Sequence, residues 1–325
     1  MREREVIERL RRIATAPEAR GLRDDVALLD GLVITHDSIA EGVHFLPHDP
    51  PASVGWKLVA VNLSDLAGKG ATPAGALLSL TISGPGEWER ALLGGIEAAC
   101  ESYGLPLLGG DTIALPAASP RVLGLTVLGR AGPRVPPRSG GRPGDSLWLI
   151  GTVGDAAAGL DQLRADGKAE GPLVDIYRRP VPQLEAGRSL APLANAMMDI
   201  SDGLLIDALR MAEASDCAMV IDLDRLSLSS AFVAERGQGL RARLFAATGG
   251  DDYALLAALP ADVEPVTLSL PKRTRIERIG SLVAGKASLS LTYAGEPVEL
   301  PERLGFEHQG TDHRGLSAPP MADRP

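Results

Sequence analysis

A stretch rich in proline and glycine divides this chain into two parts. Residues 131–144 read AGPRVPPRSGGRPG, and neither a helix nor a central strand can persist there. The chain has 325 residues, more than one hydrophobic core usually organises, and each part is long enough to bury an interior. We predict an N-terminal domain at residues 1–135, a C-terminal domain at residues 136–309, and a flexible tail at residues 310–325 with little apolar periodicity.

Composition excludes several classes of protein. Hydrophobic residues make up 45% of the chain, and no apolar run reaches the roughly 20 residues of a membrane helix. The N-terminus, MREREVIERLRR, carries charge where a secretion signal has an apolar core, so we expect an amphipathic helix and a cytoplasmic protein. Cys100 and Cys217 lie far apart, which argues against a disulfide or a zinc site. A formal charge of −9 argues against a surface for DNA or RNA.

Hydrophobic periodicity predicts the elements of the N-terminal part. The apolar residues 28–35 predict a strand that ends at His36-Asp37-Ser38, and residues 53–67 have the apolar spacing of a helix that Gly68-Lys69-Gly70 ends. A strand at 77–82, a helix at 87–102 and a short strand at 105–108 follow. The last strand leads into the run Gly109-Gly110-Asp111-Thr112.

The C-terminal part has strands that lead through short polar turns into helices. A strand at 146–150 is followed by GTVGD and a helix at 156–164, and a strand at 197–200 is followed by Ser201-Asp202-Gly203 and another helix. This alternation is typical of an α/β domain.

Acidic residues stand near the ends of many of these predicted elements. A single Asp in such a place is ordinarily structural, since it caps helices and forms turns. Asn62 and Asp65, three residues apart, share one face of the predicted helix. Near the C-terminus of a helix the macrodipole disfavours the charge of Asp65 unless a cation compensates it. The acids are Asp24-Asp25, Asp37, Asp65, Asp111, Asp199, Asp202 and Asp251-Asp252.

Eight ordered segments carry a resemblance to a known family. They are LRDDVALL (22–29), THDSIAEGVHF (35–45), VGWKLVAVNLSDLAGKGATP (54–73), LLGGDT (107–112), PRSGGRPGD (137–145), GTVGDAAAGL (151–160), MDISDGLLID (198–207) and TGGDDYALL (248–256). In this order they resemble the thiamine-monophosphate kinase family, within the larger group of aminoimidazole ribonucleotide synthetase and selenophosphate synthetase. The segments span nearly the whole chain.

The resemblance implies a fold and an activity. The fold is a two-domain α+β architecture, in which an N-terminal domain of mixed sheet and helices pairs with its copy in a homodimer. A C-terminal α/β domain closes over the nucleotide. The activity is Mg²⁺-dependent transfer of the γ-phosphoryl of ATP to thiamine phosphate, which yields thiamine diphosphate.

The resemblance also assigns roles to individual residues. The Mg²⁺ ligands are Asp25, Thr35, Asp37, Asp65, Asp111, Asp199 and Asp202. The ATP phosphates meet Gly110, Asp111, Arg138 and Ser201. Thiamine phosphate meets His44, Asp251 and Phe306, whose ring stacks on one of the substrate's rings.

This chemistry suits a chain with many acids. Phosphoryl transfer passes through a loose transition state, so positioning and cations supply most of the catalysis, and Mg²⁺ prefers carboxylate oxygens. The attacking phosphate oxygen is already ionised near neutrality, since the second pKa of a phosphate monoester is about 6. No residue is therefore expected to act as a general base.

Three positions depart from the family's pattern. Arg23 stands where the second Gly of Gly-x-Gly-Asp-Asp is usual, His36 stands in the middle of Ser-Thr-Asp, and Asp251 replaces a Glu. We expect Arg23 to contact phosphate or solvent. Two alternatives remain open: an ATP-dependent enzyme of the same superfamily with another small substrate, and a non-catalytic protein that binds Mg–ATP.

Overall fold

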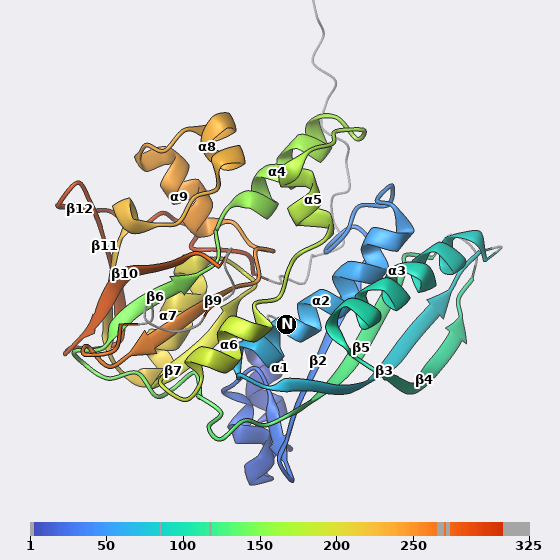
Figure 1. Cartoon of the computed structure of the whole chain (residues 1–325), viewed down its shortest axis with the longest axis horizontal. Coiled ribbons are helices and arrows are strands. Elements are labelled where there is room, and N and C mark those ends of the chain that lie inside the picture. Colours follow the sequence, from blue (N-terminus) through green and yellow to red (C-terminus); the bar gives the residue numbers. More distant parts are fainter. Residues whose placement is uncertain (1–2, 85, 117–118, 265–269, 271–273, 308–325) are drawn as a thin grey trace, which may run out of the picture.

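Two β-sheets, one in each half of the chain, form the framework of the protein (Figure 1). The computed structural model describes residues 3–84, 86–116, 119–264, 270 and 274–307, so the predicted tail at 310–325 lies outside the described residues. Helices cover both sheets, and the α+β class predicted from the sequence is confirmed. No helix among the described residues is long and apolar enough to span a membrane.

The N-terminal sheet has the strand order β1-β2-β5-β3-β4. The pairing of β3 with β4 is parallel and the other pairings are antiparallel, so the sheet is mixed. Its strands are β1 (Ala27–Leu29), β2 (Leu32–Ala40), β3 (Thr72–Ile82), β4 (Leu107–Ala114) and β5 (Val122–Arg130). Its helices are α1 (Glu3–Leu10), η1 (Pro17–Leu22), α2 (Pro51–Gly68) and α3 (Glu87–Tyr103).

Two predicted strand ends in this sheet are wrong. The strand predicted at 28–35 is two strands, because Asp30 and Gly31 have φ values of 48° and 77° and form a hairpin turn between β1 and β2. Asp37 therefore lies inside β2. The glycine pair before Asp111 does not end its strand either, since β4 continues to Ala114 in register with β3. A Cβ on Gly110 would lie 1.9 Å from the carbonyl oxygen of Leu78, so the close pairing requires glycine.

The C-terminal sheet has the strand order β12-β11-β8-β10-β6-β9-β7. β8 and β11 are parallel, and the other pairings are antiparallel. Its strands are β6 (Ser146–Ile150), β7 (Ala196–Ile200), β8 (Ala218–Asp222), β9 (Ala254–Leu259), β10 (Ile276–Val283), β11 (Ser288–Tyr293) and β12 (Glu296–Val298). Its helices are α4 (Asp155–Ala165), α5 (Pro172–Arg178), α6 (Leu184–Leu190), α7 (Leu204–Ser215), η2 (Leu223–Arg225), α8 (Ser230–Arg236) and α9 (Leu240–Thr248).

The two halves share a hydrophobic core. Every residue of β6 is buried because both faces of the strand are covered. Leu147 and Leu149 belong to the apolar cluster that contains α7 residues, whereas Trp148 and Ile150 belong to the cluster that contains α2 and the N-terminal sheet. The chain between Arg130 and Ser146 has no helix or strand, as predicted, and a boundary at residue 135 stays a prediction.

Helix α2 lies between the two sheets (Figure 1) and contacts β2, β5, β7 and α6. Fifteen of its 18 residues are buried, so it is covered nearly all round. The predicted helix at 53–67 is confirmed, and Gly70, with φ of 63°, follows its end. A helix in such surroundings needs apolar side chains, yet it carries Lys57, Asn62, Ser64 and Asp65 in buried positions. Buried polar groups are costly unless they are partnered, which makes these side chains candidates for function.

Candidate active site

Three acidic side chains from distant parts of the sequence meet beside the end of α2. Asp25 precedes β1, Asp65 lies in the last turn of α2, and Asp199 lies in β7. One carboxylate oxygen from each lies within 4.8 Å of the others. Three of the residues that the resemblance assigns to Mg²⁺ therefore lie together, although they come from both halves of the chain.

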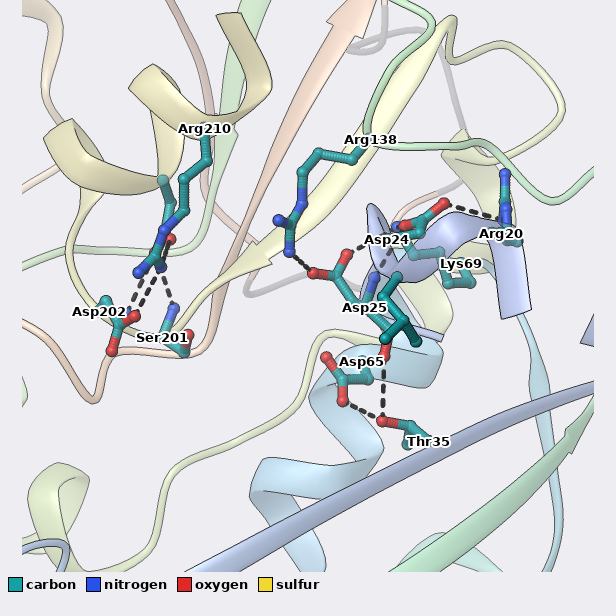
Figure 2. Close-up of polar contacts among 12 residues, drawn as sticks. Arg20, Asp24, Asp25, Thr35, Asp65, Lys69, Arg138, Ser201, Asp202 and Arg210 are labelled. Carbon is teal, nitrogen blue, oxygen red and sulfur yellow. Dashed lines mark hydrogen bonds and ion pairs between the residues drawn. The ribbon is translucent and has the colours of Figure 1, made fainter. Parts of the chain in front are cut away.

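Strand β2 brings Thr35 and Asp37 to the same place. The Thr35 hydroxyl donates a hydrogen bond to Oδ2 of Asp65 (Figure 2), and the Asp37 backbone N–H donates one of 2.8 Å to Oδ1 of Asn62. Asn62 and Asp65 thus use the one helix face predicted from their spacing to hold β2. The buried amide of Asn62 also donates to the Leu58 carbonyl at 2.9 Å, which fixes its orientation.

Burial and the crowding of like charges raise the pKa values of Asp37, Asp65 and Asp199. Burial and the nearby Asp25 raise the pKa of Asp37 to about 6 and that of Asp199 to about 8. Burial, with Asp37 and Asp199, raises the pKa of Asp65 well above its usual value. The charge of Asp202 also acts on Asp37, so Asp202 belongs to the same electrostatic group. Carboxylates that repel one another in a buried site are a donor set that fits Mg²⁺, because a divalent cation offsets their charge.

Asp25 differs because two cations hold it. Lys69 Nζ lies 2.8 Å from its Oδ2 and 2.6 Å from Oδ1 of Asp24, and Arg138 donates to its Oδ1 (Figure 2). Burial alone would raise the pKa of Asp25, but Lys69 and Arg138 outweigh it and hold the pKa well below the usual range. Arg20 contacts the other oxygen of Asp24 at 3.0 Å.

Lys69 was not predicted from the sequence. It follows α2 between two glycines, where a lysine ordinarily lies in solvent. Here it is fully buried, and Nζ also donates to the Met197 carbonyl on β7 at 2.9 Å. Only the position of α2 between the sheets places this cation inside the protein. Arg138 was predicted for ATP phosphates, and its place on Asp25 brings it to the site.

The turn after β7 is held by an acid and an arginine of α7. The backbone N–H groups of Ser201 and Asp202 each donate to Oδ2 of Asp207 at 3.1 Å. Arg210 bridges Asp202 at 2.6 Å and Asp207 at 2.8 Å; Figure 2 shows it beside this turn. Burial raises the pKa of Asp207 to about 6 although Arg210 lowers it. The two predicted residues Ser201 and Asp202 therefore have a fixed backbone.

The residues predicted to bind thiamine phosphate lie around this turn. The Asp251 N–H donates to the Ser201 carbonyl at 2.8 Å, and the Phe306 N–H donates to the Asp202 carbonyl at 2.9 Å. The Phe306 side chain is exposed, as an aromatic surface that stacks on a ligand must be. The Ala40 N–H donates to Nδ1 of His44 at 3.0 Å, and Lys57, also missed in the sequence, joins His44 to Asp251.

Asp111 does not join this cluster within one chain. Asp37, Leu125, Leu78 and Gly110 form one row across the sheet, so Gly110 lies three strand spacings, about 14 Å, from Asp37. Asp111 shares the next row with Ser38, and its side chain points to the opposite face of the sheet from Asp37. Asp111, which the resemblance assigns to Mg²⁺ with the other acids, thus lies apart from them within the same chain.

Arg23 causes no conflict at the site. Its φ is −114°, so the position does not require glycine. The side chain is exposed, and among the described residues it forms no ion pair. This agrees with the solvent exposure expected as one of its two possible placements.

Comparison with known proteins identifies the family. Residues 23–131 match the model of the AIR synthase related protein N-terminal domain, and residues 142–291 match that of the C-terminal domain. Thiamine-monophosphate kinase of Escherichia coli (strain K12) is 37% identical over 311 residues, which cover 90% of this chain and 92% of that protein. The relative of the same name from Caulobacter vibrioides is 36% identical, with 90% and 86% covered.

A solved structure agrees with these relatives. AaThiL complexed with AMPPCP and TMP superimposes with a TM-score of 0.81 and is 29% identical, with 95% of this chain and 97% of that chain covered. The acidic cluster, the turn at Ser201 and Asp202, and the match along both domains lead to one conclusion. The chain belongs to the thiamine-monophosphate kinase family.

Proposed function

We propose that this protein transfers the γ-phosphoryl of ATP to thiamine phosphate and releases ADP and thiamine diphosphate. The observation that carries the proposal is the convergence of Asp25, Asp65 and Asp199 from both halves of the chain. The names of the relatives, and the ATP analogue and TMP in the complex of AaThiL, support the same reaction.

Bound Mg²⁺ would neutralise charge on the triphosphate and on the phosphoryl group as it is transferred. Residues of both halves of the chain would hold it, and they are assigned by their donor chemistry and mutual position. Asp25 is already ionised before the metal binds, since Lys69 and Arg138 keep its pKa low. The proposed ligands are Asp25, Thr35, Asp37, Asp65, Asp199 and Asp202.

The protein's remaining work is to bind and orient the two substrates. Ser201 and Arg138 face the nucleotide phosphates. When they bind, Arg138 gives up part of its contact with Asp25 and contacts the phosphates instead. Asp251, His44 and Phe306 hold thiamine phosphate, with the Phe306 ring against a ring of the substrate. The ionised acceptor phosphate attacks without transferring a proton to a side chain, so no general base is assigned.

We further propose that the active form is a homodimer in which Asp111 and Gly110 of one copy serve the site of the other. All eight residues of the edge strand β4 are exposed, including Leu107, Leu108 and Ile113. An apolar edge strand with unpaired backbone groups is a place for another chain to bind. A second copy on this side would cover the sheet face that carries Asp111. A cytoplasmic location belongs to the same proposal.

The experiment that tests the reaction follows ADP release with thiamine phosphate and with thiamine as separate acceptors, and identifies the product. We expect thiamine diphosphate from thiamine phosphate and no turnover of thiamine, because the proposal assigns no base to its neutral hydroxyl. Equal conversion of thiamine would mean that the acceptor is wrong. Tight ATP binding without turnover of either acceptor would leave a nucleotide-binding protein.

A further inference from the structure

The second lysine of α2 occupies an unusual position. Lys57 is 2% exposed, in the middle of a helix that is covered nearly all round. A buried ammonium is costly unless it is paired and hydrogen-bonded. Its Nζ donates to Oδ2 of Asp251 at 2.9 Å and to the His44 carbonyl at 2.9 Å, and lies 4.1 Å from the centre of the Tyr177 ring.

These contacts join three segments that are distant in sequence. His44 lies after β2, Tyr177 lies on α5, and Asp251 lies between α9 and β9. The Tyr177 hydroxyl donates to Asp49 at 3.3 Å, and Arg178 contacts the other oxygen of Asp49 at 3.1 Å. The segment from His44 to Asp49 is thereby fixed to α5, with Lys57 at the centre of the arrangement.

The loop that carries Asp251 is strained. Asp251 and Tyr253 have φ values of 69° and 53°, in the left-handed region that residues with a Cβ rarely adopt. Such a conformation persists only where the surroundings determine it, and it clusters at functional sites. Both carboxylate oxygens of Asp251 are held, Oδ1 by the Tyr253 hydroxyl at 3.1 Å and Oδ2 by Lys57.

Exposure distinguishes the roles of the two partners. The Asp251 side chain is 24% exposed, whereas that of Lys57 is 2% exposed. A ligand in the site can reach the carboxylate but not the ammonium behind it. We propose that Lys57 is a positioning residue that acts through Asp251, fixing the carboxylate that binds the organic, cationic part of thiamine phosphate. This inference rests on the proposed function.

The test measures ligand binding in the full chain by calorimetry, without ATP, for thiamine phosphate and for thiamine. We expect K57M to weaken both ligands by the same factor, at least about tenfold, as for the loss of a charge-assisted contact. AMPPCP binding should stay within about twofold of wild type, since Lys57 contacts none of the proposed nucleotide ligands. K57R should recover part of the loss. The matched control is K286M, which removes an exposed lysine between β10 and β11.

Each outcome decides the matter. Loss of thiamine phosphate affinity with normal thiamine affinity would show that Lys57 contacts the phosphate directly and would overturn the positioning role. Ordinary affinity in a folded K57M protein would overturn the inference alone, whereas failure of the wild type to bind or convert thiamine phosphate would overturn the proposed function as well.

A double-mutant cycle keeps the test valid where K57M alone does not fold. K57M/D251N removes both charges, and its affinity should equal that of D251N within about twofold, because Lys57 then has no carboxylate to position. A further loss of about tenfold relative to D251N would show that Lys57 acts independently, and would overturn the inference.

Discussion

The ammonium of Lys69 lies 2.8 Å from the carboxylate of Asp25, so the proposed metal site contains a cation that belongs to the chain. Burial lowers the pKa of Lys69, but Asp25 and Asp24 outweigh this and raise it, so the ammonium stays charged. A bound metal ion therefore meets an Asp25 whose charge is already partly offset. The same lysine fixes the loop before β1 to β7 through Met197.

We predict that K69M destabilises the protein and that Mg²⁺ recovers part of the loss. Removing one partner of a buried ion pair costs about 3–5 kcal/mol, because the other charge is left buried. A divalent cation at Asp25 supplies the missing charge, so Mg²⁺ should raise the urea midpoint of K69M more than that of wild type. Urea unfolding of both proteins with EDTA and with Mg²⁺ measures this. Equal midpoints in EDTA would contradict the prediction.

We predict that D65N abolishes phosphoryl transfer without loss of the fold. Asn resembles the protonated form of Asp65, which the raised pKa favours in the absence of metal. The thermal midpoint in EDTA should therefore equal or exceed that of wild type, while the increase caused by Mg²⁺ becomes smaller. Turnover and melting are measured on the same preparation, with E277Q, an exposed site on β10, as control. Wild-type activity in folded D65N would remove Asp65 from the site.

The raised pKa values predict how Mg²⁺ stabilisation depends on pH. The folded pKa of Asp37 is about 6 and that of Asp199 is about 8, both above the ordinary 3.8. A group with a raised folded pKa stabilises the fold while it is protonated, and this contribution is lost as the pH rises through the folded pKa. The metal-free protein should thus lose stability from these two groups between about pH 4, near their ordinary pKa, and about pH 8, the folded pKa of Asp199.

Mg²⁺ binds the ionised carboxylates, so its effect on the melting temperature should grow across the same window. Scanning calorimetry from about pH 5.5 to about pH 8.5, with EDTA and with Mg²⁺, measures the difference at each pH. D199N removes the group with a pKa of about 8, so its Mg²⁺ effect should be smaller and should change less above about pH 7. A Mg²⁺ effect that is constant with pH in wild type would exclude these titrations.

The sequence predicted the parts of the site that depend on local pattern. Asn62 and Asp65 were placed on one helix face by their spacing, and this face does hold β2. The turn at Ser201 and Asp202 was placed between a strand and a helix, and the structure agrees. The sequence pattern did not predict which polar side chains are buried. Lys57 and Lys69 read as ordinary helix and turn lysines, and only the packing of α2 between two sheets makes them buried cations.

Strand pairing is the second feature that the sequence pattern did not predict. A glycine pair ordinarily ends a strand, but pairing with β3 extends β4 through Gly109 and Gly110. The face on which Asp111 lies follows from that register and from no local signal. Local sequence segments considered one at a time group Asp111 with the other acids. The strand pairing instead puts Asp111 on the opposite face of the N-terminal sheet from Asp37.

This placement predicts complementation between two inactive variants. D65N and D111N should each be inactive as homodimers. If Asp111 acts across the interface, one site of a mixed dimer carries both substitutions and the other carries neither. The site without substitutions is active. Because mixed dimers form about half of a randomly reassorted equimolar mixture and each has one intact site, about a quarter of wild-type activity should return.

To measure this, the two variants are unfolded and refolded together, and the activity of the mixture is compared with that of each variant treated alone. If Asp111 acts within its own chain, both sites of the mixed dimer carry one substitution and the mixture stays inactive. Sedimentation of the wild-type protein as a monomer would contradict the dimer itself.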